Sequence, residues 1–209
     1  MRPSTPAYDQ SWDLNLLIAW LESLEPNNRL NLLTLHMKCI ILFKLVDLSQ
    51  SVDMLAVFYK SIQFSNTNMS GTRRPLKSYT RDRPLNFRYN RFENANLCVV
   101  AVWEEYFTRT RNIPRNKDQV FVSHSQPFKE IGTEQIAKDT LQAMKSAGID
   151  IDRFKSHSTH MAVVSKALNL GASVNDVMRA GRWKSKSVFD KFYNQAKHMD
   201  IGKLVLSNR

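Results

Sequence analysis

The sequence predicts a mainly α-helical domain with a small antiparallel β-sheet. Apolar residues recur at helical spacing in the first and last thirds of the chain, whereas the middle third contains short alternating segments separated by turn residues. The predicted order is helices, a small sheet and then helices again, which is typical of a mixed, mainly α (α+β) domain. A length of 209 residues suffices for one large domain or two small ones.

Three helices are expected before the sheet. Residues 1–10 are rich in Pro, Ser and Thr and are expected to form a flexible tail, so that one domain spans residues 11–209. Apolar residues at helical spacing predict helices at residues 11–24, 32–48 and 50–59. Ser11 is the candidate N-cap of the first helix, because its hydroxyl can accept a hydrogen bond from the first turn.

Short strands and further helices follow. Alternating segments predict strands at residues 61–64, 76–80, 85–89 and 119–122. Helical spacing predicts helices at residues 94–108, 133–146, 157–168, 173–180 and 185–196. Two of these helices have clear end signals, because Gly148 can stop the one that begins at Thr133 and Ser173 can cap the one at residues 173–180.

The charge of the chain is basic and unevenly spread. There are 30 Lys and Arg against 19 Asp and Glu, a formal net charge of +11. Residues 60–91 hold eight basic residues and one acid, and residues 153–197 hold nine basic residues and two acids, so each segment has a net charge of +7. Clustering of this kind favours a binding surface for a polyanion over a diffuse solubility charge. A nucleic acid or an anionic membrane surface fits that class of partner.

Cysteine usage and hydropathy exclude several classes of protein. Cys39 and Cys98 lie in apolar runs without zinc-finger spacing, so we expect two buried thiols and neither a disulfide framework nor a metal site. The N-terminus has no apolar signal region, and the longest apolar stretch, residues 35–46, is too short to span a bilayer and is interrupted by Lys38 and Lys44. We therefore expect no membrane partner and a location in the nucleus or the host-cell interior.

The last third of the chain carries the most specific motif. It reads His157-Ser-Thr-His160, then Gly181-Arg-Trp183, and then Phe189-Asp-Lys-Phe192-Tyr193. At these residues the sequence resembles the catalytic domain of the tyrosine recombinases, the phage-integrase family, in particular the versions carried by eukaryotic mobile elements. The spacings agree with that family, because 23 residues separate position 160 from Trp183 and ten separate Trp183 from Tyr193.

The resemblance implies a reaction and a role for each residue. The family attacks a DNA phosphodiester with a Tyr hydroxyl, forms a 3′-phosphotyrosyl link and releases a 5′-hydroxyl without a metal or other cofactor. Tyr193 falls on the nucleophile, and Lys77 resembles the hairpin Lys that protonates the leaving oxygen. His157 falls on the His of the family's His-x-x-Arg motif, and Trp183 on the His/Trp position, where its indole N–H can donate to a phosphate oxygen. Taken alone, Tyr193 and Trp183 can also be core aromatics, and Lys77 can be one more basic residue that faces phosphate.

Two positions depart from the family pattern. The second Arg of the family belongs at position 160, where this chain has His160. The first belongs at a helix start three residues before an acid, and in the frame that contains Asp53 this slot is Gln50. Gln50 can donate one neutral hydrogen bond, and His160 can donate one and can carry a proton beside phosphate, but neither has the planar fork of a guanidinium. We therefore expect impaired or lost strand cleavage, and the cations available as substitutes are Arg74, Arg179 and Arg182.

The same resemblance implies double-stranded DNA as the partner. The surfaces that the family lays against the duplex coincide with the two basic segments, and the residues expected to contact DNA are Arg73, Arg74, Arg81, Arg83, Lys155, Arg182, Lys184 and Lys186. Family members act as tetramers on DNA, so we expect a homo-oligomer on DNA and a monomer without it. Most members also have an N-terminal arm domain, and the chain begins too late to contain one.

Three functions are compatible with the sequence. The chain can be a recombinase domain for DNA recombination or integration with impaired or lost catalysis. It can be a domesticated, non-catalytic DNA-binding or chromatin adaptor that keeps the fold without the reaction. It can also be a protein-interaction or RNA-binding domain, although the sequence lacks an RNA-recognition signature.

Overall fold

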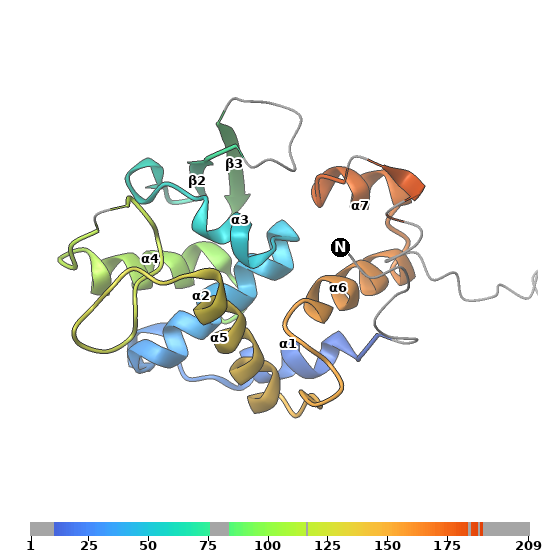
Figure 1. The fold of residues 1–209 in the computed structure, drawn as a ribbon, viewed down its shortest axis with the longest axis horizontal. Helices are drawn as coiled ribbons and strands as arrows, with labels where there is room; N and C mark the ends of the chain where they lie inside the picture. The colour runs from blue at the N-terminus through green and yellow to red at the C-terminus, as the bar shows by residue number, and fades with distance from the viewer. Residues whose placement is uncertain (1–10, 76–83, 116, 184, 188, 190–209) are drawn as a thin grey trace, which may run out of the picture.

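Helices surround one central helix in the computed structural model, and a small sheet lies beside them (Figure 1). The structure describes residues 11–75, 84–115, 117–183, 185–187 and 189. Within these ranges the helices are α1 (Leu14–Ser23), α2 (Leu32–Asp47), α3 (Ser51–Leu55), α4 (Val99–Thr110), α5 (Thr133–Ser146), α6 (Ser158–Asn169) and α7 (Val174–Ala180). The strands are β1 (Gln63–Phe64), β2 (Asn68–Arg73) and β3 (Leu85–Asn90), and the short 3-10 helices are η1 (Asn27–Arg29) and η2 (Tyr59–Ser61). The predicted class, mainly helical with a small antiparallel sheet, is confirmed.

Helix α2 is the centre of the core. It packs against α4, α5 and α6, and its side chains Leu35, Ile40 and Phe43 are completely buried. Apolar residues lie all around this helix, which is the pattern of a helix without a solvent face. Figure 1 shows α4 on one side of α2 and α6 and α7 on the other. Phe43 contacts Trp103 of α4, with ring centroids 4.6 Å apart, so that α2 and α4 share one aromatic cluster.

Polar side chains cap several helices. Asp13 caps α1 and Asn31 caps α2, each by accepting a hydrogen bond of 2.8–2.9 Å from a backbone N–H of the first turn. Ser173 caps α7, as predicted. The prediction of Ser11 as the cap of the first helix was wrong, because α1 begins after Asp13 and that carboxylate supplies the accepting oxygen.

The predicted helices are present with some changes of bounds. Residues 133–146 form α5 as predicted, and Gly148 follows it in the left-handed region with φ of 78°. The helix predicted at residues 50–59 is only the short α3, because the chain then turns into a bridge with β2. The helix predicted at residues 94–108 is α4, shifted toward the C-terminus. Most of the helix predicted at residues 185–196 lies outside the described residues.

The strands were predicted less well than the helices. Strand β3 matches the prediction at residues 85–89, and β1 is the end of the prediction at residues 61–64. The prediction missed β2, because Asn-Met-Ser-Gly-Thr-Arg has few β-branched or aromatic residues and contains a Gly. The strand predicted at residues 76–80 lies outside the described residues, and residues 119–122 make only isolated bridges in the described structure.

The sheet is antiparallel in the order β1-β2-β3 and has one buried face. Met69 and Arg73 of β2 and Phe87 of β3 point toward the helices, and the opposite face is polar and more exposed. Gly71 lets the side chains of Ile62 and Phe87 approach the strand, because a Cβ at this position would lie 2.4 and 2.8 Å from them.

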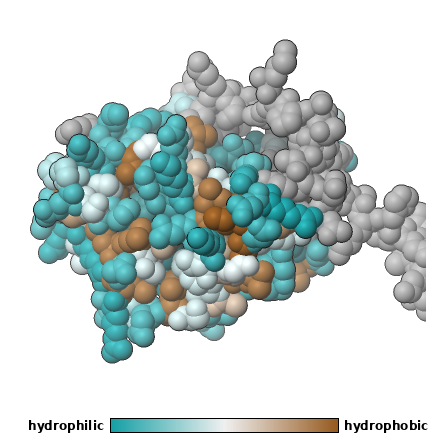
Figure 2. Space-filling model, turned by 60° about the horizontal axis from the view of Figure 1, so that its bottom comes forward, coloured by the Kyte–Doolittle hydropathy of each residue, from teal (hydrophilic) through white to brown (hydrophobic). Residues whose placement is uncertain are grey.

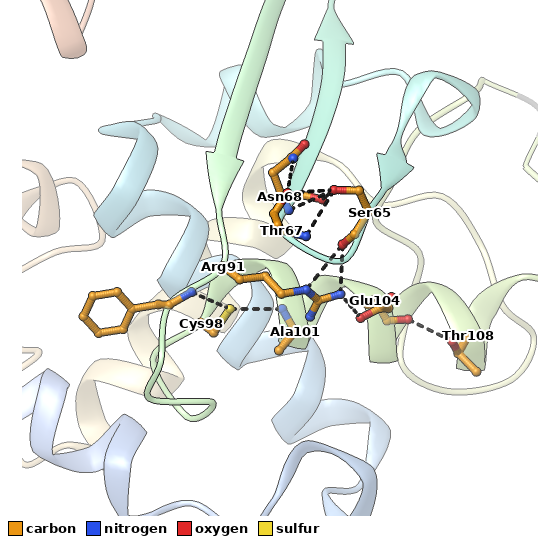
Figure 3. Close-up of polar contacts among 9 residues, drawn as sticks. Ser65, Thr67, Asn68, Arg91, Cys98, Ala101, Glu104 and Thr108 are labelled. Carbon is orange, nitrogen blue, oxygen red and sulfur yellow. Dashed lines mark hydrogen bonds and ion pairs between the residues drawn. The ribbon is translucent and has the colours of Figure 1, made fainter.

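Polar contacts fix the connection from β3 to α4 (Figure 3). Arg91, directly after β3, donates to the Ser65 carbonyl at 3.3 Å and forms an ion pair with Glu104 of α4 at 2.6 Å. The Cys98 sulfur accepts hydrogen bonds from the backbone N–H groups of Phe92 and Ala101, at 3.3 and 3.4 Å. The prediction that Cys98 is a buried thiol is confirmed, and its role here is to cap α4.

Among the described residues, no helix is both long enough and apolar enough to cross a bilayer. On the face in Figure 2, apolar patches are small and are separated by polar residues. Scattered exposed apolar side chains of this kind are normal for a folded domain.

Helix α2 ends at Asp47, whose buried carboxylate joins three parts of the chain. Arg73 of β2 donates two hydrogen bonds to it, both 2.7 Å long, in a bidentate ion pair. Tyr89 of β3 donates its hydroxyl to the same carboxylate, and Arg182, after α7, donates two further hydrogen bonds of 3.0 and 3.2 Å. Burial alone would raise the pKa of Asp47, but these partners outweigh it and hold the pKa below its usual value.

We predict that Asp47→Asn destabilises the fold by about 3–5 kcal/mol. The amide has the same shape but leaves the buried charge of Arg73 without a carboxylate. Urea unfolding followed by circular dichroism measures the change. The matched control is Glu104→Gln, which removes the half-exposed ion pair with Arg91 and should change stability by less than about 1 kcal/mol. Equal effects of the two variants would contradict an anchoring role for Asp47.

Candidate functional site

Four segments of chain meet at the C-terminal end of α2. They are this end itself, the start of α3, the start of α6 and the turn that follows α7. Gln50 is the exposed residue that precedes α3, and its backbone N–H donates to the buried Asp53 carboxylate at 2.7 Å. Asp53 therefore fixes the start of α3, in the arrangement of an acid three residues after a helix start.

His157 and His160 lie at the start of α6. His157 is the exposed residue before the helix, whereas His160, one turn later, is buried with 9% of its surface exposed. His160 makes a hydrogen bond with the backbone of Leu48, directly after α2. Its ring stacks on the indole of Trp183, with centroids 4.8 Å apart and an angle of 17° between the planes. The structure thus brings His160 and Trp183 together beside the segment that leads to Gln50.

A tight turn after α7 places Trp183. Gly181 ends α7, and Arg182 adopts a left-handed conformation with φ of 61°. A Cβ at Gly181 would lie 2.0 Å from the Trp183 ring, so a Gly is needed here for the indole to reach His160. Trp183 also meets Phe189 edge-on, with centroids 5.0 Å apart. Aromatic packing therefore holds Trp183, and its contact with a phosphate stays a prediction.

Burial and neighbouring cations keep His160 neutral. Burial is the main cause that lowers the pKa of His160 to about 3, and the charges of Lys44 and Arg182 lower it further. Asp47 and the hydrogen bond with Leu48 act in the opposite direction without compensating. Without an anion beside it, the ring therefore favours its neutral form at neutral pH, and protonation of His160 beside a phosphate stays a prediction. Burial and the charge of Lys44 also lower the pKa of His157.

Two arginines that were expected on the DNA-binding surface are bonded to Asp47. Arg73 is 2% exposed, so the prediction that it contacts DNA was wrong, because its guanidinium is inside the fold in the bidentate ion pair. Arg182 is 21% exposed and donates to both the carboxylate and the backbone carbonyl of Asp47. Arg182 therefore lies beside His160 with its guanidinium already bonded to a carboxylate.

The other two cations considered as substitutes, Arg74 and Arg179, bond residues outside the candidate site. Arg74 lies over the Phe58 ring, 4.8 Å from its centroid, and donates to the Lys117 carbonyl. Arg179 is 82% exposed and lies 3.6 Å from Asp176 on the same helix. In the described structure neither of them contacts a residue of the candidate site.

The remaining predicted residues divide into exposed ones and ones that the structure does not describe. Lys155 and Lys186 are exposed, which suits a contact with phosphate. Outside the described residues lie Lys77, Arg81, Arg83, Lys184 and Tyr193, so their roles stay predictions.

Sequence reasoning missed two charged residues of this region, Lys44 and Asp47. Lys44 lies in the last turn of α2, has 6% of its surface exposed and shifts the pKa values of both His157 and His160. The signal was a Lys and an Asp near the end of an otherwise apolar helix, because buried charges require a partner or a function.

The chemistry of the region suits an anion. Among the described residues, no three His, Cys, Asp or Glu side chains are grouped as a metal site would require. Three side chains can donate hydrogen bonds to the oxygens of a phosphate: Gln50 before α3, His157 before α6 and Lys44 in the last turn of α2.

Comparison with solved structures identifies the fold. No protein-family model and no curated protein matches the sequence. The structure is similar to the XerH site-specific recombinase bound to difH substrate in a pre-cleavage complex, with a TM-score of 0.67 and 11% identity over 97% of this chain and 53% of that chain. It is also similar to FLP recombinase in a Holliday junction complex, with a TM-score of 0.53 and 13% identity over 86% of this chain and 45% of that chain. The chain therefore has the fold of a tyrosine recombinase catalytic domain and spans about half the length of these proteins.

We predict that the His160 imidazole stays neutral between about pH 5 and pH 8, because its pKa lies near 3. Side-chain NMR signals of His160 should not shift over this range in the folded protein and should titrate near the ordinary value of about 6.5 in urea. The unfolded chain then binds a proton that the folded chain does not, so this group lowers folding stability as pH falls from about 6.5 toward about 3. A midpoint above about pH 5 in the folded protein would contradict the burial argument.

Proposed function

We propose that this chain is a DNA-binding domain of the tyrosine-recombinase type, with impaired or lost strand cleavage. The observation that carries the proposal is that neither of the two positions where the family has a catalytic arginine holds a charged side chain. In the frame of the resemblance these are Gln50 and the neutral His160, and the guanidinium of Arg182 beside them is bonded to Asp47.

The chemistry of strand cleavage explains why these positions matter. In this proposal Tyr193 attacks the phosphodiester and Lys77 protonates the leaving oxygen, while His157 and Trp183 donate to phosphate oxygens. Loss of one preorganised donor slows such a reaction by about 10²–10³-fold, and loss of two charged donors slows it further. A neutral amide and a neutral imidazole supply single hydrogen bonds in place of two bidentate guanidinium groups, so slow or absent cleavage follows.

DNA binding does not depend on those two positions. Arg73 belongs to the basic segment at residues 60–91 and Arg182 to the one at residues 153–197, and both bond the same carboxylate of Asp47. The two basic segments therefore meet at Asp47, and we propose that their exposed cations, which include Lys155 and Lys186, contact DNA. The similar structures named above are a recombinase–substrate complex and a Holliday junction complex. Phosphate contacts on such a surface are largely independent of DNA sequence and sensitive to salt.

A second candidate is a domesticated, non-catalytic DNA-binding or chromatin adaptor derived from the recombinase of a mobile element. The combination of a preserved fold with a neutral His160 and a neutral Gln50 favours it. Under both candidates we place the domain on DNA inside the cell, in the nucleus of a eukaryotic host. We also propose that the chain is a monomer without DNA and an oligomer on it, and that only the first candidate takes part in recombination or integration.

We predict salt-dependent binding to duplex DNA of mixed sequence. Each phosphate contact adds about −0.9 to the slope of log K against log salt concentration, so we expect a slope steeper than about −3 from fluorescence anisotropy. Lys155→Gln/Lys186→Gln should reduce the slope by about 2. The matched control is Arg29→Gln, which removes an exposed cation outside both basic segments and should leave the slope unchanged. A flat plot for the unmodified chain would contradict the proposal.

We predict that restoring both guanidinium groups restores cleavage. On a nicked suicide substrate, Gln50→Arg/His160→Arg should form a covalent protein–DNA adduct at least about 10²-fold faster than the unmodified chain. Adding Tyr193→Phe to the double variant should abolish the adduct, and a thermal melt shows whether the buried substitution at His160 leaves the fold intact. An unmodified chain that forms the adduct as fast as the double variant would show that catalysis is not impaired.

A further inference from the structure

We propose that Lys44 is the phosphate-binding cation of the candidate site, where its ammonium contacts a non-bridging oxygen of a DNA phosphodiester. The inference rests on the proposed function. It names the residue that supplies positive charge where Gln50 and His160 supply none.

Lys44 is a largely buried residue whose ammonium is not among the fully buried polar atoms without a hydrogen bond, so it can meet a partner from outside the fold. Only 6% of the residue is exposed, and its Nζ makes no hydrogen bond or ion pair with any described residue. Lys38, on the same helix, is also buried but donates to the Asn96 side chain at 3.1 Å. Buried cations are normally paired or hydrogen-bonded, because the loss of water must be compensated. Lys38 has its hydrogen-bond partner within the fold, whereas the ammonium of Lys44 is open to an external acceptor.

Lys44 lies where the candidate site residues meet. Its charge lowers the pKa values of His157 and His160 at the start of α6. Its own pKa is raised in part by Asp53, which fixes the start of α3 behind Gln50. Lys44 lies in the last turn of α2, and this end of the helix leads directly to Gln50 and the start of α3. The exposed His157 marks the side from which a ligand can reach it.

The fold compensates this charge only in part. Lys44 lies in the last turn of α2, where the free carbonyl groups of a helix favour a cation. The Asp53 carboxylate is nearby but accepts the Gln50 N–H at 2.7 Å. Burial dominates over both effects and lowers the pKa of Lys44 to about 8. A phosphate oxygen can accept a hydrogen bond from the ammonium and adds negative charge beside it.

A lysine at this position also fits a domain that binds DNA without efficient strand cleavage. An ammonium is a compact point charge, whereas a guanidinium holds two oxygens in a fixed plane. Lys44 can therefore hold the phosphate of the substrate, and it cannot clamp the equatorial oxygens of the transition state as two arginines do.

The first experiment follows the lysine side chains of the unmodified chain by NMR. Inorganic phosphate and, separately, a duplex of mixed sequence are added, and the Cε and Nζ signals of Lys44 are recorded. We expect both probes to shift these signals and to move the titration midpoint of Lys44 upward by about one pH unit, because the anion stabilises the charged form. The Lys38 signals are the internal control and should not move.

The second experiment measures duplex affinity of two variants. Lys44→Met should weaken binding about tenfold, the scale of one charged hydrogen bond, and Lys44→Arg should bind at least as tightly as the unmodified chain. Urea unfolding of Lys44→Met should show stability equal to or above that of the unmodified chain, because Met keeps the buried apolar stem and no hydrogen bond within the described structure is lost. A large loss of stability would assign Lys44 a structural role and overturn the proposal.

The two experiments separate this inference from the proposed function. If the chain binds the duplex but neither probe shifts the Lys44 signals, the inference is overturned and the proposed function stands. If phosphate shifts the Lys44 signals but the chain does not bind duplex DNA, the proposed function is contradicted and Lys44 is supported as an anion site.

Discussion

One buried carboxylate, that of Asp47, holds the parts of this fold that are far apart in sequence. Three groups donate to it, and they come from β2, from β3 and from the turn after α7. A lone buried carboxylate would be strongly unfavourable, and it is the two guanidinium groups that keep it charged. Because Arg182 directly precedes Trp183, the same interaction also sets the turn from which the indole stacks on His160.

This use of arginine determines the electrostatics of the candidate site. The chain is rich in arginine, yet Arg73 and Arg182 are bonded to Asp47 and stabilise the architecture. Their charge still acts at short range, because Arg182 helps to keep His160 neutral. The net charge of +11 therefore does not indicate how much charge is available for chemistry, and the burial and partners of each cation decide that question.

Sequence reasoning succeeded where the determinants are local. The periodicity of residues 133–146 and the cap at Ser173 depend on neighbours within one or two turns, and both were predicted. Arg73 was misread, because its partner lies 26 residues away and only the alternation with Met69 and Gly71 along β2 shows that it points inward. For Asp47 a signal did exist, since an acid at the C-terminal end of a helix is opposed by the helix dipole and requires cations from elsewhere.

The motif that led to the recombinase fold consists largely of residues that the fold itself needs. Gly181 makes room for the Trp183 ring, and Asp53 fixes the start of α3. These contacts are needed for packing whether or not the chain cleaves a phosphodiester. At the two positions where the family pattern has arginine, this chain has an amide at Gln50 and, at His160, a ring that stacks on Trp183. Within the described residues, the ammonium of Lys44 makes no hydrogen bond that holds the architecture together, in contrast to Arg73 and Arg182. The frame of this site is therefore explained by packing and by the ion pairs of Asp47, and a charge that does neither is the one available to a ligand.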